Sequence, residues 1–167
     1  MVRSTTGVGG EEARMEIVVQ RHVAASPQRV RDIVTAIEAS PGVISAVEGV
    51  ERLDQGAGFD VGMRWRETRT MFGRQATEEM AVTAVDAPRS YTTTSVNGAT
   101  TCTSTISVQP GGRDGCVLRM SFAGRSSGVV NRLLAATVGR LFAGATRRAL
   151  RQDLDDIADH AEADRTA

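Results

Sequence analysis

Five polar side chains on predicted strands are of the types that an active site uses. They are Arg21, Glu67, Arg69, Glu78 and Tyr91, and strand alternation puts them on the same face as the apolar residues. Carboxyl, guanidinium and phenol groups serve acid–base and electrostatic catalysis. Burying any of them without a partner would be costly. They therefore form a paired cluster, lie at the solvent-filled opening of a cavity, or form an exposed ladder of cross-strand ion pairs. The fourth alternative is that the assumed strand register is shifted by one residue, which would place these side chains on the outer face.

The other common catalytic and metal-binding patterns are absent from the sequence. It has no Gly-rich phosphate loop, no nucleophile elbow and no Cys/His cluster with metal-ligand spacing. His22 falls on the outward face of the first predicted strand, and His160 lies near the end of the last predicted helix. Cys102 and Cys116 have no activating neighbour and are expected to be small strand residues rather than nucleophiles. We therefore expect no metal and no cofactor.

Alternation along the predicted strands separates an inward set of side chains from an outward set. With Leu118, Met120 and Phe122 taken as inward, the matching inward residues are Ile17, Val19, Arg21, Val23, Met63, Trp65, Glu67, Arg69, Glu78, Met80, Val82, Tyr91, Thr93 and Ser95. Three methionines, the only Trp and the only Tyr thus share one face. Methionine tolerates varied shapes, which suits a pocket for an apolar ligand. An ordinary side-chain-filled core is the alternative.

The elements that position these residues begin with a strand and a helix. Residues 15–23 are rich in β-branched side chains, which favours a strand. Ser26 and Pro27 then give an N-cap followed by proline at the first helical position. The apolar residues that follow recur at the spacing of an amphipathic helix: Val30, Ile33, Val34 and Ile37. This helix must stop at or just before Ser40, because Pro41 disfavours helical geometry in the residue ahead of it, and a short second helix could follow.

Five or six further strands are expected, separated by turn residues. Asn97-Gly98 is the strongest turn signal, because a two-residue type I′ turn needs positive φ at both positions. The other turns are predicted at residues 55–58, 72–73, 87–88 and 110–115. This short, even spacing indicates an antiparallel meander. A helix over about 128–162 follows; it would span roughly 50 Å, enough to lie across the sheet and close it.

This order of elements resembles the START-like or helix-grip superfamily, which includes polyketide cyclases and lipid-transfer domains. The matching strings run in family order over roughly residues 15–162: "HVAASPQRVRDIVTAIEASPGV", "GVERLDQGAGFDVGMRWRETRTMFGR", "TEEMAVTAVDAPRSYTTTS" and "RRALRQDLDDIADHAE". The resemblance implies an α+β fold: an antiparallel curved sheet of six to seven strands wrapped around the long C-terminal helix, with one or two short helices after the first strand. It implies an apolar cavity between sheet and helix but no single activity, since function here depends on the cavity residues.

Our first functional hypothesis is the binding of an apolar small molecule, such as a lipid, isoprenoid or polyketide, in that cavity. The expected ligand-binding residues are Met63, Trp65, Met80, Tyr91, Met120, Phe122, Gly139 and Ala143. The resemblance to polyketide aromatase/cyclases implies a second hypothesis, a cyclase or dehydratase. In such an enzyme Arg69 or Arg21 would stabilise an enolate, and Tyr91 or Glu67 would move the proton.

The apolar residues of the last predicted helix change sides near Gly144. One stripe contains Leu150, Leu154, Ile157 and Ala161, and the other, roughly 160° away, contains Leu134, Val138, Leu141 and Ala145. In a straight helix the sheet-facing stripe continues through the small residues Gly139 and Ala143, which would leave room for a ligand. The other stripe would then need a partner, and a homodimer through Leu134, Val138 and Leu141 is one hypothesis. A kink at Gly144 would bring both stripes to one core and imply no partner.

Charge and composition restrict the partners further. The chain has 20 basic and 20 acidic residues, so its net charge offers no attraction for polyanions and we expect no nucleic-acid partner. A third hypothesis, an interaction module, would use the basic cluster Arg132, Arg140, Arg147 and Arg151.

Charged residues interrupt the last helix, which excludes a transmembrane span. We expect one ligand-binding domain over 15–162, with tails at 1–14 and 163–167, in a bacterial, cytoplasmic protein.

Overall fold

The structure is a computed structural model that describes the backbone of residues 13–71, 73–97, 100–112, 115–126 and 129–163. Side chains are described over the same ranges except at residues 13–15, 97, 126 and 129–142.

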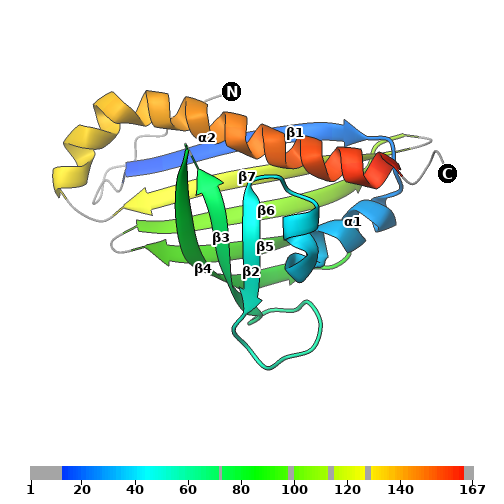
Figure 1. The fold of residues 1–167 in the computed structure, drawn as a ribbon. Coiled ribbons are helices and arrows are strands. Elements are labelled where there is room, and N and C mark those ends of the chain that lie inside the picture. The colour runs from blue at the N-terminus through cyan, green and yellow to red at the C-terminus, as the bar shows by residue number, and fades with distance from the viewer. Residues whose placement is uncertain (1–12, 72, 98–99, 113–114, 127–128, 164–167) are drawn as a thin grey trace.

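A single antiparallel sheet of seven strands, in the order β1-β7-β6-β5-β4-β3-β2, forms the body of the fold (Figure 1). The strands are β1 Ala13–Val23, β2 Val47–Arg52, β3 Arg64–Met71, β4 Arg74–Asp86, β5 Ser90–Asn97, β6 Thr100–Pro110 and β7 Cys116–Ser126. The helices are α1 Pro27–Thr35, the 3-10 helix η1 Ile37–Gly42 and the long C-terminal α2 Val129–Ala163. The predicted α+β helix-grip architecture is confirmed, with seven strands and two short helices after the first strand.

The sheet turns a corner along β4. Residues 74–81 of this strand pair with β3, whereas residues 80–86 pair with β5, and a bulge interrupts the register between Val82 and Ala84. A bulge bends a strand and increases its twist. As a result β2, β3 and the start of β4 cross in front of the other strands, and the sheet curls toward α2 (Figure 1).

Helix α1 begins as predicted but ends earlier. The Ser26 hydroxyl accepts a hydrogen bond from the backbone N–H of Arg29 at 3.2 Å, and Pro27 occupies the first turn. The helix ends at Thr35, because Ala36 leaves the helical region with φ −80° and ψ 65°. The chain then continues as η1, which contains Pro41. The expected stop near Ser40 is therefore corrected to Thr35, followed by a 3-10 helix.

The concave side of the sheet carries the core. The larger apolar cluster packs β1, β5, β6 and β7 against α1 and α2, and the smaller one surrounds Trp65. Strand alternation is confirmed, since the residues expected inward that are buried are Ile17, Val19, Val23, Met63, Trp65, Val82, Tyr91, Thr93, Ser95, Leu118 and Met120. The remaining members of the inward set are half-buried: Arg21, Glu67, Arg69, Glu78, Met80 and Phe122.

Helix α2 is continuous through Gly144 and runs along β1 (Figure 1). Its predicted stripe Leu150, Leu154, Ile157 and Ala161 is buried. The other stripe, with Leu134, Val138 and Leu141, lies outside the described side chains, as do Gly139, Arg132 and Arg140. In the part of the chain that the structure describes, no helix is long and apolar enough to cross a membrane.

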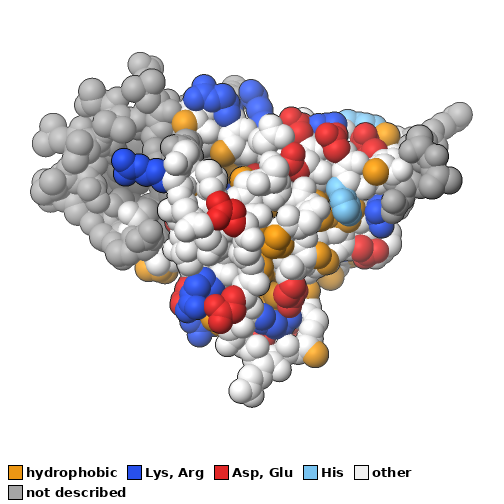
Figure 2. Space-filling view, in the orientation of Figure 1, with side chains coloured by type: hydrophobic (Ala, Val, Ile, Leu, Met, Phe, Trp, Pro, Cys, Tyr) orange, Lys and Arg blue, Asp and Glu red, His pale blue; other side chains and the backbone are white. Residues whose placement is uncertain are grey.

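Acidic side chains gather over the C-terminal half of α2 (Figure 2). Asp156 accepts hydrogen bonds from the backbone N–H and the hydroxyl of Ser45, at 2.7 and 2.6 Å, just before β2. Glu162 accepts one from the backbone N–H of Ala24, at 2.7 Å, just after β1. These carboxylates therefore connect α2 to segments that adjoin the two opposite edge strands.

We expect Leu154→Ala to lower the free energy of unfolding by about 2–5 kcal/mol, because Leu154 is 1% exposed and the truncation leaves a cavity. Urea denaturation would measure it. The control is Arg151→Ala, an exposed position three residues away, which should change stability by less than about 0.5 kcal/mol. Equal losses in both variants would mean that α2 is not packed as described.

Candidate functional site

A buried ion pair joins the sheet to α2 on the concave side. Arg69 of β3 donates from Nη2 to both carboxylate oxygens of Asp153, at 2.9 and 2.8 Å. The Asp153 side chain is only 4% exposed and that of Arg69 23%. Asp153 was not among the residues singled out from the sequence. Its position on the buried stripe, one residue before Leu154, was the signal that could have identified it.

Two glutamates face each other beside this pair. Glu67 of β3 and Glu78 of β4 are direct cross-strand partners on the inward face. Glu67 has only long contacts, 3.7 Å to a nitrogen of Arg69 and 3.5 Å to the indole nitrogen of Trp65. Glu78 accepts one hydrogen bond from the Ser95 hydroxyl at 3.3 Å. Like charges directly opposite each other on a sheet are destabilising.

Burial dominates the electrostatics of this group. It raises the pKa of Glu67, and the nearby Arg69 guanidinium and Trp65 indole offset only part of the effect. Burial acts against the charge on Arg69, but the surrounding carboxylates, Asp153 first among them, outweigh it and raise the pKa of Arg69. Glu67 is thus held closer to its protonated form than an exposed glutamate would be.

Two buried polar atoms, one on α2 and one on β3, have no hydrogen-bond partner among the described residues. One is the Thr146 hydroxyl of α2, in a residue that is 3% exposed. Thr146 lies seven residues before Asp153, so both side chains project from one face of the helix. The Nε of Arg69 is also buried and unpartnered. Buried polar groups without partners are rare in folded proteins and call for an explanation.

Arg21 and Tyr91 pair with groups other than Glu67 and Arg69. Arg21 forms ion pairs with Asp155 and, at 3.1 Å, with Asp159, and its side chain is 31% exposed at the flank of α2. The buried Tyr91 hydroxyl donates to the backbone carbonyl of Val34 at 2.8 Å, and burial raises the pKa of Tyr91. Of the four catalytic candidates, only Glu67 and Arg69 therefore lie together.

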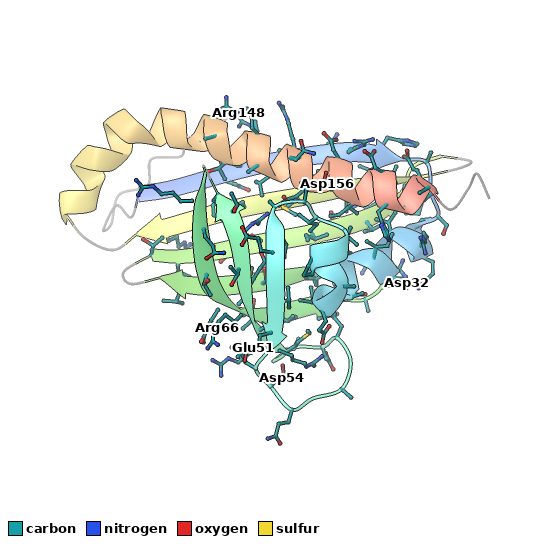
Figure 3. The ribbon with its side chains drawn as sticks, in the orientation of Figure 1. Asp32, Glu51, Asp54, Arg66, Arg148 and Asp156 are labelled. Atoms are coloured by element: carbon teal, nitrogen blue, oxygen red, sulfur yellow. The ribbon has the colours of Figure 1, made fainter. Side chains whose placement is uncertain are left out.

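An exposed ladder of ion pairs also exists, but on the outer face of the same strands. Arg66 contacts Glu51 at 2.8 Å and Glu79 at 2.9 Å, and Arg64 contacts Glu79 at 3.3 Å. Figure 3 shows Arg66 and Glu51 side by side, away from α2. The ladder is one residue out of phase with the inward cluster and is made of other residues. The alternative that Glu67, Arg69 and Glu78 themselves form an exposed ladder is therefore wrong, since Arg69 and Glu67 are 23% and 14% exposed.

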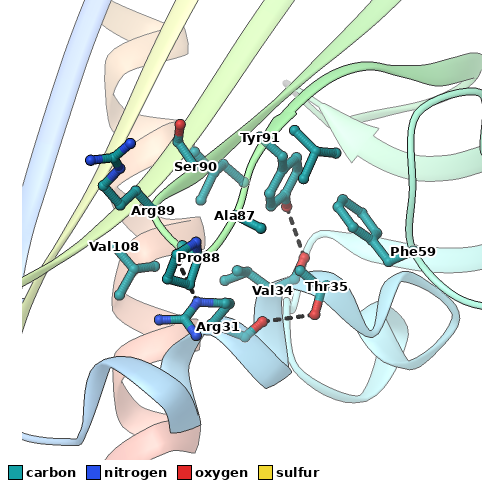
Figure 4. A pocket seen from close by; sticks show the side chains of 12 residues that line it. Arg31, Val34, Thr35, Phe59, Ala87, Pro88, Arg89, Ser90, Tyr91 and Val108 are labelled. Atoms are coloured by element: carbon teal, nitrogen blue, oxygen red, sulfur yellow. Dashed lines mark hydrogen bonds between the residues drawn. The ribbon is translucent and has the colours of Figure 1, made fainter.

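A pocket of about 200 Å³ opens at the other end of the concave side, between α1 and the β4–β5 turn (Figure 4). Its lining residues are Arg31, Val34, Thr35, Phe59, Val85, Ala87, Pro88, Arg89, Ser90, Tyr91, Ile106 and Val108. Phe59 and Tyr91 meet edge to face, with ring centroids 4.7 Å apart. Tyr91 is the one expected ligand-binding residue in this lining; the rest of the lining was missed because it comes from segments far apart in the sequence.

The other expected ligand-binding residues lie deeper. Met63 and Trp65 belong to the smaller cluster, with Met80 packed against it. Met120 belongs to the larger cluster, with Phe122 and Ala143 packed against it. Gly139 lies outside the described side chains.

The Arg69–Asp153 pair generates a prediction about stability. Asp153→Asn should cost roughly 3–5 kcal/mol, because it removes the carboxylate charge that accepts both short hydrogen bonds from the buried guanidinium of Arg69. Asp159→Asn is the control: that side chain is 73% exposed, and its ion pair with Arg21 should contribute less than about 1 kcal/mol. Chemical denaturation would show the difference, and equal effects of the two substitutions would contradict the assigned role of Asp153.

A second prediction concerns pH. Folding raises the pKa of Glu67 above its ordinary value of 4.5, so the folded protein binds the carboxyl proton more tightly than the unfolded chain does. As the pH rises above about 4.5, ionisation of Glu67 therefore lowers the stability of the folded state. Glu67→Gln should therefore raise Tm at pH 7.5, with a gain that shrinks toward pH 4. Calorimetry from pH 4 to 8 measures it, and a gain that is independent of pH would contradict the account.

Solved structures share this fold at low sequence identity. The protein TTHA0849 from Thermus thermophilus superposes with a TM-score of 0.73 and 15% identity, covering 89% of this chain and 98% of that one. A START superfamily protein from Mycobacterium smegmatis has a TM-score of 0.73 and 17% identity, covering 88% and 97%. The Zhui aromatase/cyclase from Streptomyces sp. R1128 has a TM-score of 0.70 and 14% identity, covering 90% and 94%.

The sequence itself points to one family. No curated protein gives a significant match to the chain. Residues 14–162 match the family model described as polyketide cyclase/dehydrase and lipid transport. Because this model spans most of the chain, the protein belongs to the polyketide cyclase/dehydrase and lipid transport family.

Proposed function

We propose that the protein binds an apolar small molecule, such as a lipid, isoprenoid or polyketide, on the concave side of its sheet. The observation that carries this proposal is the pocket of about 200 Å³ beside Tyr91, whose wall is mostly apolar and opens to the surface. A pocket of this kind, with a few polar groups at its rim, is typical of small-molecule sites. Its volume fits a small ligand or one end of a longer one.

The pocket adjoins both core clusters. Phe59 and Val85 line the pocket and pack against the larger and the smaller cluster alike. A ligand that displaced Phe59 would therefore disturb the surroundings of Trp65, the only tryptophan, which is 2% exposed. The fluorescence of Trp65 provides a reporter of binding that needs no label.

The rim of the pocket is basic. Arg31 donates to the backbone carbonyl of Pro88 and, at 2.7 Å, to the side chain of Gln28, neither of which is charged. Arg89 pairs with Asp86 at 3.0 Å. The rim can thus orient a polar group of the ligand while the apolar part lies inside.

A second candidate function, a cyclase or dehydratase, is favoured by one observation. Glu67, with a raised pKa, lies beside the Arg69 guanidinium in the interior, and this combination can move a proton and stabilise an anion. Incubation with a linear poly-β-ketone thioester tests it, with loss of water followed by mass spectrometry. Turnover that persists unchanged in Glu67→Gln would exclude Glu67 as the acid–base group.

Filling the pocket should abolish binding. Val85→Phe adds bulk to the pocket wall and should prevent uptake of an environment-sensitive apolar dye such as Nile red, at a cost of roughly 1–3 kcal/mol in stability. Val96→Phe is the matched control, because Val96 is 68% exposed. Dye fluorescence and Trp65 emission are the measurements.

The outcomes separate clearly. Dye uptake by the wild type and by Val96→Phe but not by Val85→Phe supports the proposal. Equal uptake by all three proteins would show that the pocket beside Tyr91 is not the binding site, and no uptake by the wild type would contradict the proposed function.

A further inference from the structure

The interior polar cluster contains more acidic groups than basic ones. Three carboxylates, those of Glu67, Glu78 and Asp153, surround the single guanidinium of Arg69. Asp153 takes both hydrogen bonds from Nη2 of Arg69, so this ion pair is complete. Among the described side chains, Glu67 has only the longer 3.7 Å contact with Arg69, and no cation is in contact with Glu78.

The geometry of the two glutamates makes this excess significant. They are opposite each other in the β3–β4 register, with side chains on the inward face, and the contacts that each makes are 3.3 Å or longer. Neighbouring carboxyls in a poorly solvated site repel each other unless a proton or a cation lies between them. The pair therefore favours a positively charged group.

Thr146 adds a second unsatisfied polar group to the interior, on the side of α2. Among the described residues its buried hydroxyl has no hydrogen-bond partner, and it projects from the same face of α2 as Asp153, about two turns toward the N-terminus. A hydroxyl can accept a hydrogen bond as a carboxylate can. The glutamate pair thus offers carboxylate oxygens to the three N–H donors of a primary ammonium, and the interior holds a further buried acceptor on α2.

A metal ion is a poor fit for this position. Among the described residues, no group of three or more His, Cys, Asp or Glu side chains is arranged to hold one. The surroundings of the glutamates are instead apolar: Trp65 and Met80 form the next cross-strand pair on the same face. This combination suits an organic cation with an apolar body.

We propose that the Glu67–Glu78 pair binds the protonated amine of a ligand whose apolar body lies on the concave side of the sheet. The inference rests on the proposed function and defines its ligand class, an amphipathic amine. Ser95, beside Glu78, lies four positions beyond Tyr91 along β5, roughly 13 Å at about 3.3 Å per residue. A ligand of that length would reach from the pocket to the glutamates.

The test compares three probes with one apolar body: 4-phenylbutylamine, 4-phenylbutanol and 4-phenylbutyrate. Isothermal titration calorimetry at pH 7 and low salt measures their affinities for the full chain. The alcohol reports apolar binding, and the ratio of amine to alcohol affinity reports the cation site. We expect the amine to bind at least tenfold more tightly than the alcohol and the carboxylate to bind most weakly.

Substitutions of the two glutamates test whether they cause the preference for the amine over the alcohol. Glu67→Gln, Glu78→Gln and the double variant should reduce amine affinity toward that of the alcohol and leave the alcohol unchanged. Glu79→Gln removes the same charge one residue away, on the outer face where Glu79 pairs with Arg66, and should retain the preference. Thermal denaturation confirms that each variant is folded. If the double variant does not fold, the two single variants are enough for the comparison.

The outcomes distinguish the amine site from the apolar binding proposed above. Equal affinity for amine and alcohol, or tighter binding of the carboxylate, overturns the amine site but leaves apolar binding intact. An amine preference that survives in Glu67→Gln and Glu78→Gln also overturns it. Failure of all three probes to bind contradicts the proposed function and, with it, the amine site.

Discussion

The buried contact between Arg69 and Asp153 is the interaction on which the arrangement of this interior depends. An open sheet with β1 at one edge and β2 at the other has no intrinsic reason to curl around a helix. The bulge in β4 turns the corner, and Arg69 then reaches α2 from the far part of the sheet. Surface carboxylates of α2 add contacts near both edges of the sheet, although each exposed ion pair alone contributes little to the free energy of unfolding.

This interaction also determines what the rest of the interior can do. Since Asp153 satisfies Nη2 of Arg69, Arg69 cannot fully neutralise Glu67. The cost of burying Glu67 therefore remains, as its raised pKa shows, and a protein seldom retains such a cost in its core without a function. The same concave side thus combines an apolar pocket at one end with unneutralised carboxyls farther in.

Much of the fold could be predicted from the sequence because strands have a period of two. Once Leu118 and Met120 were taken as inward, alternation identified the inward residues on the other strands, and a slip of one residue would have buried the charged ladder instead. The predicted end of α1 was wrong because the chain leaves helical geometry at Ala36, well before Pro41, and Pro41 lies inside the 3-10 helix that follows.

The candidate site was predicted less completely, for two reasons. The spacing of apolar residues in α2 predicts its buried stripe, but nothing in that spacing identifies Asp153, on the same side of the helix, as the partner of Arg69. The pocket beside Tyr91 is built from α1, the segment before β3, the β4–β5 turn and β6, and no periodicity in the sequence brings these together. Alternation placed Tyr91 inward, but its hydrogen bond to Val34 depends on where α1 lies.

The most direct test of the account is NMR of the protein with ¹³C-labelled methionine methyl groups in the presence of 4-phenylbutylamine. Met63, Trp65 and Met80 form the apolar cluster at one end of β3, whereas Met71 is at the other end of this strand, four residues beyond Glu67. The account predicts intermolecular NOEs from the ligand to Met80, with little change at Met71. Ligand NOEs confined to Met71, or saturable binding without NOEs to Met63 or Met80, would contradict it.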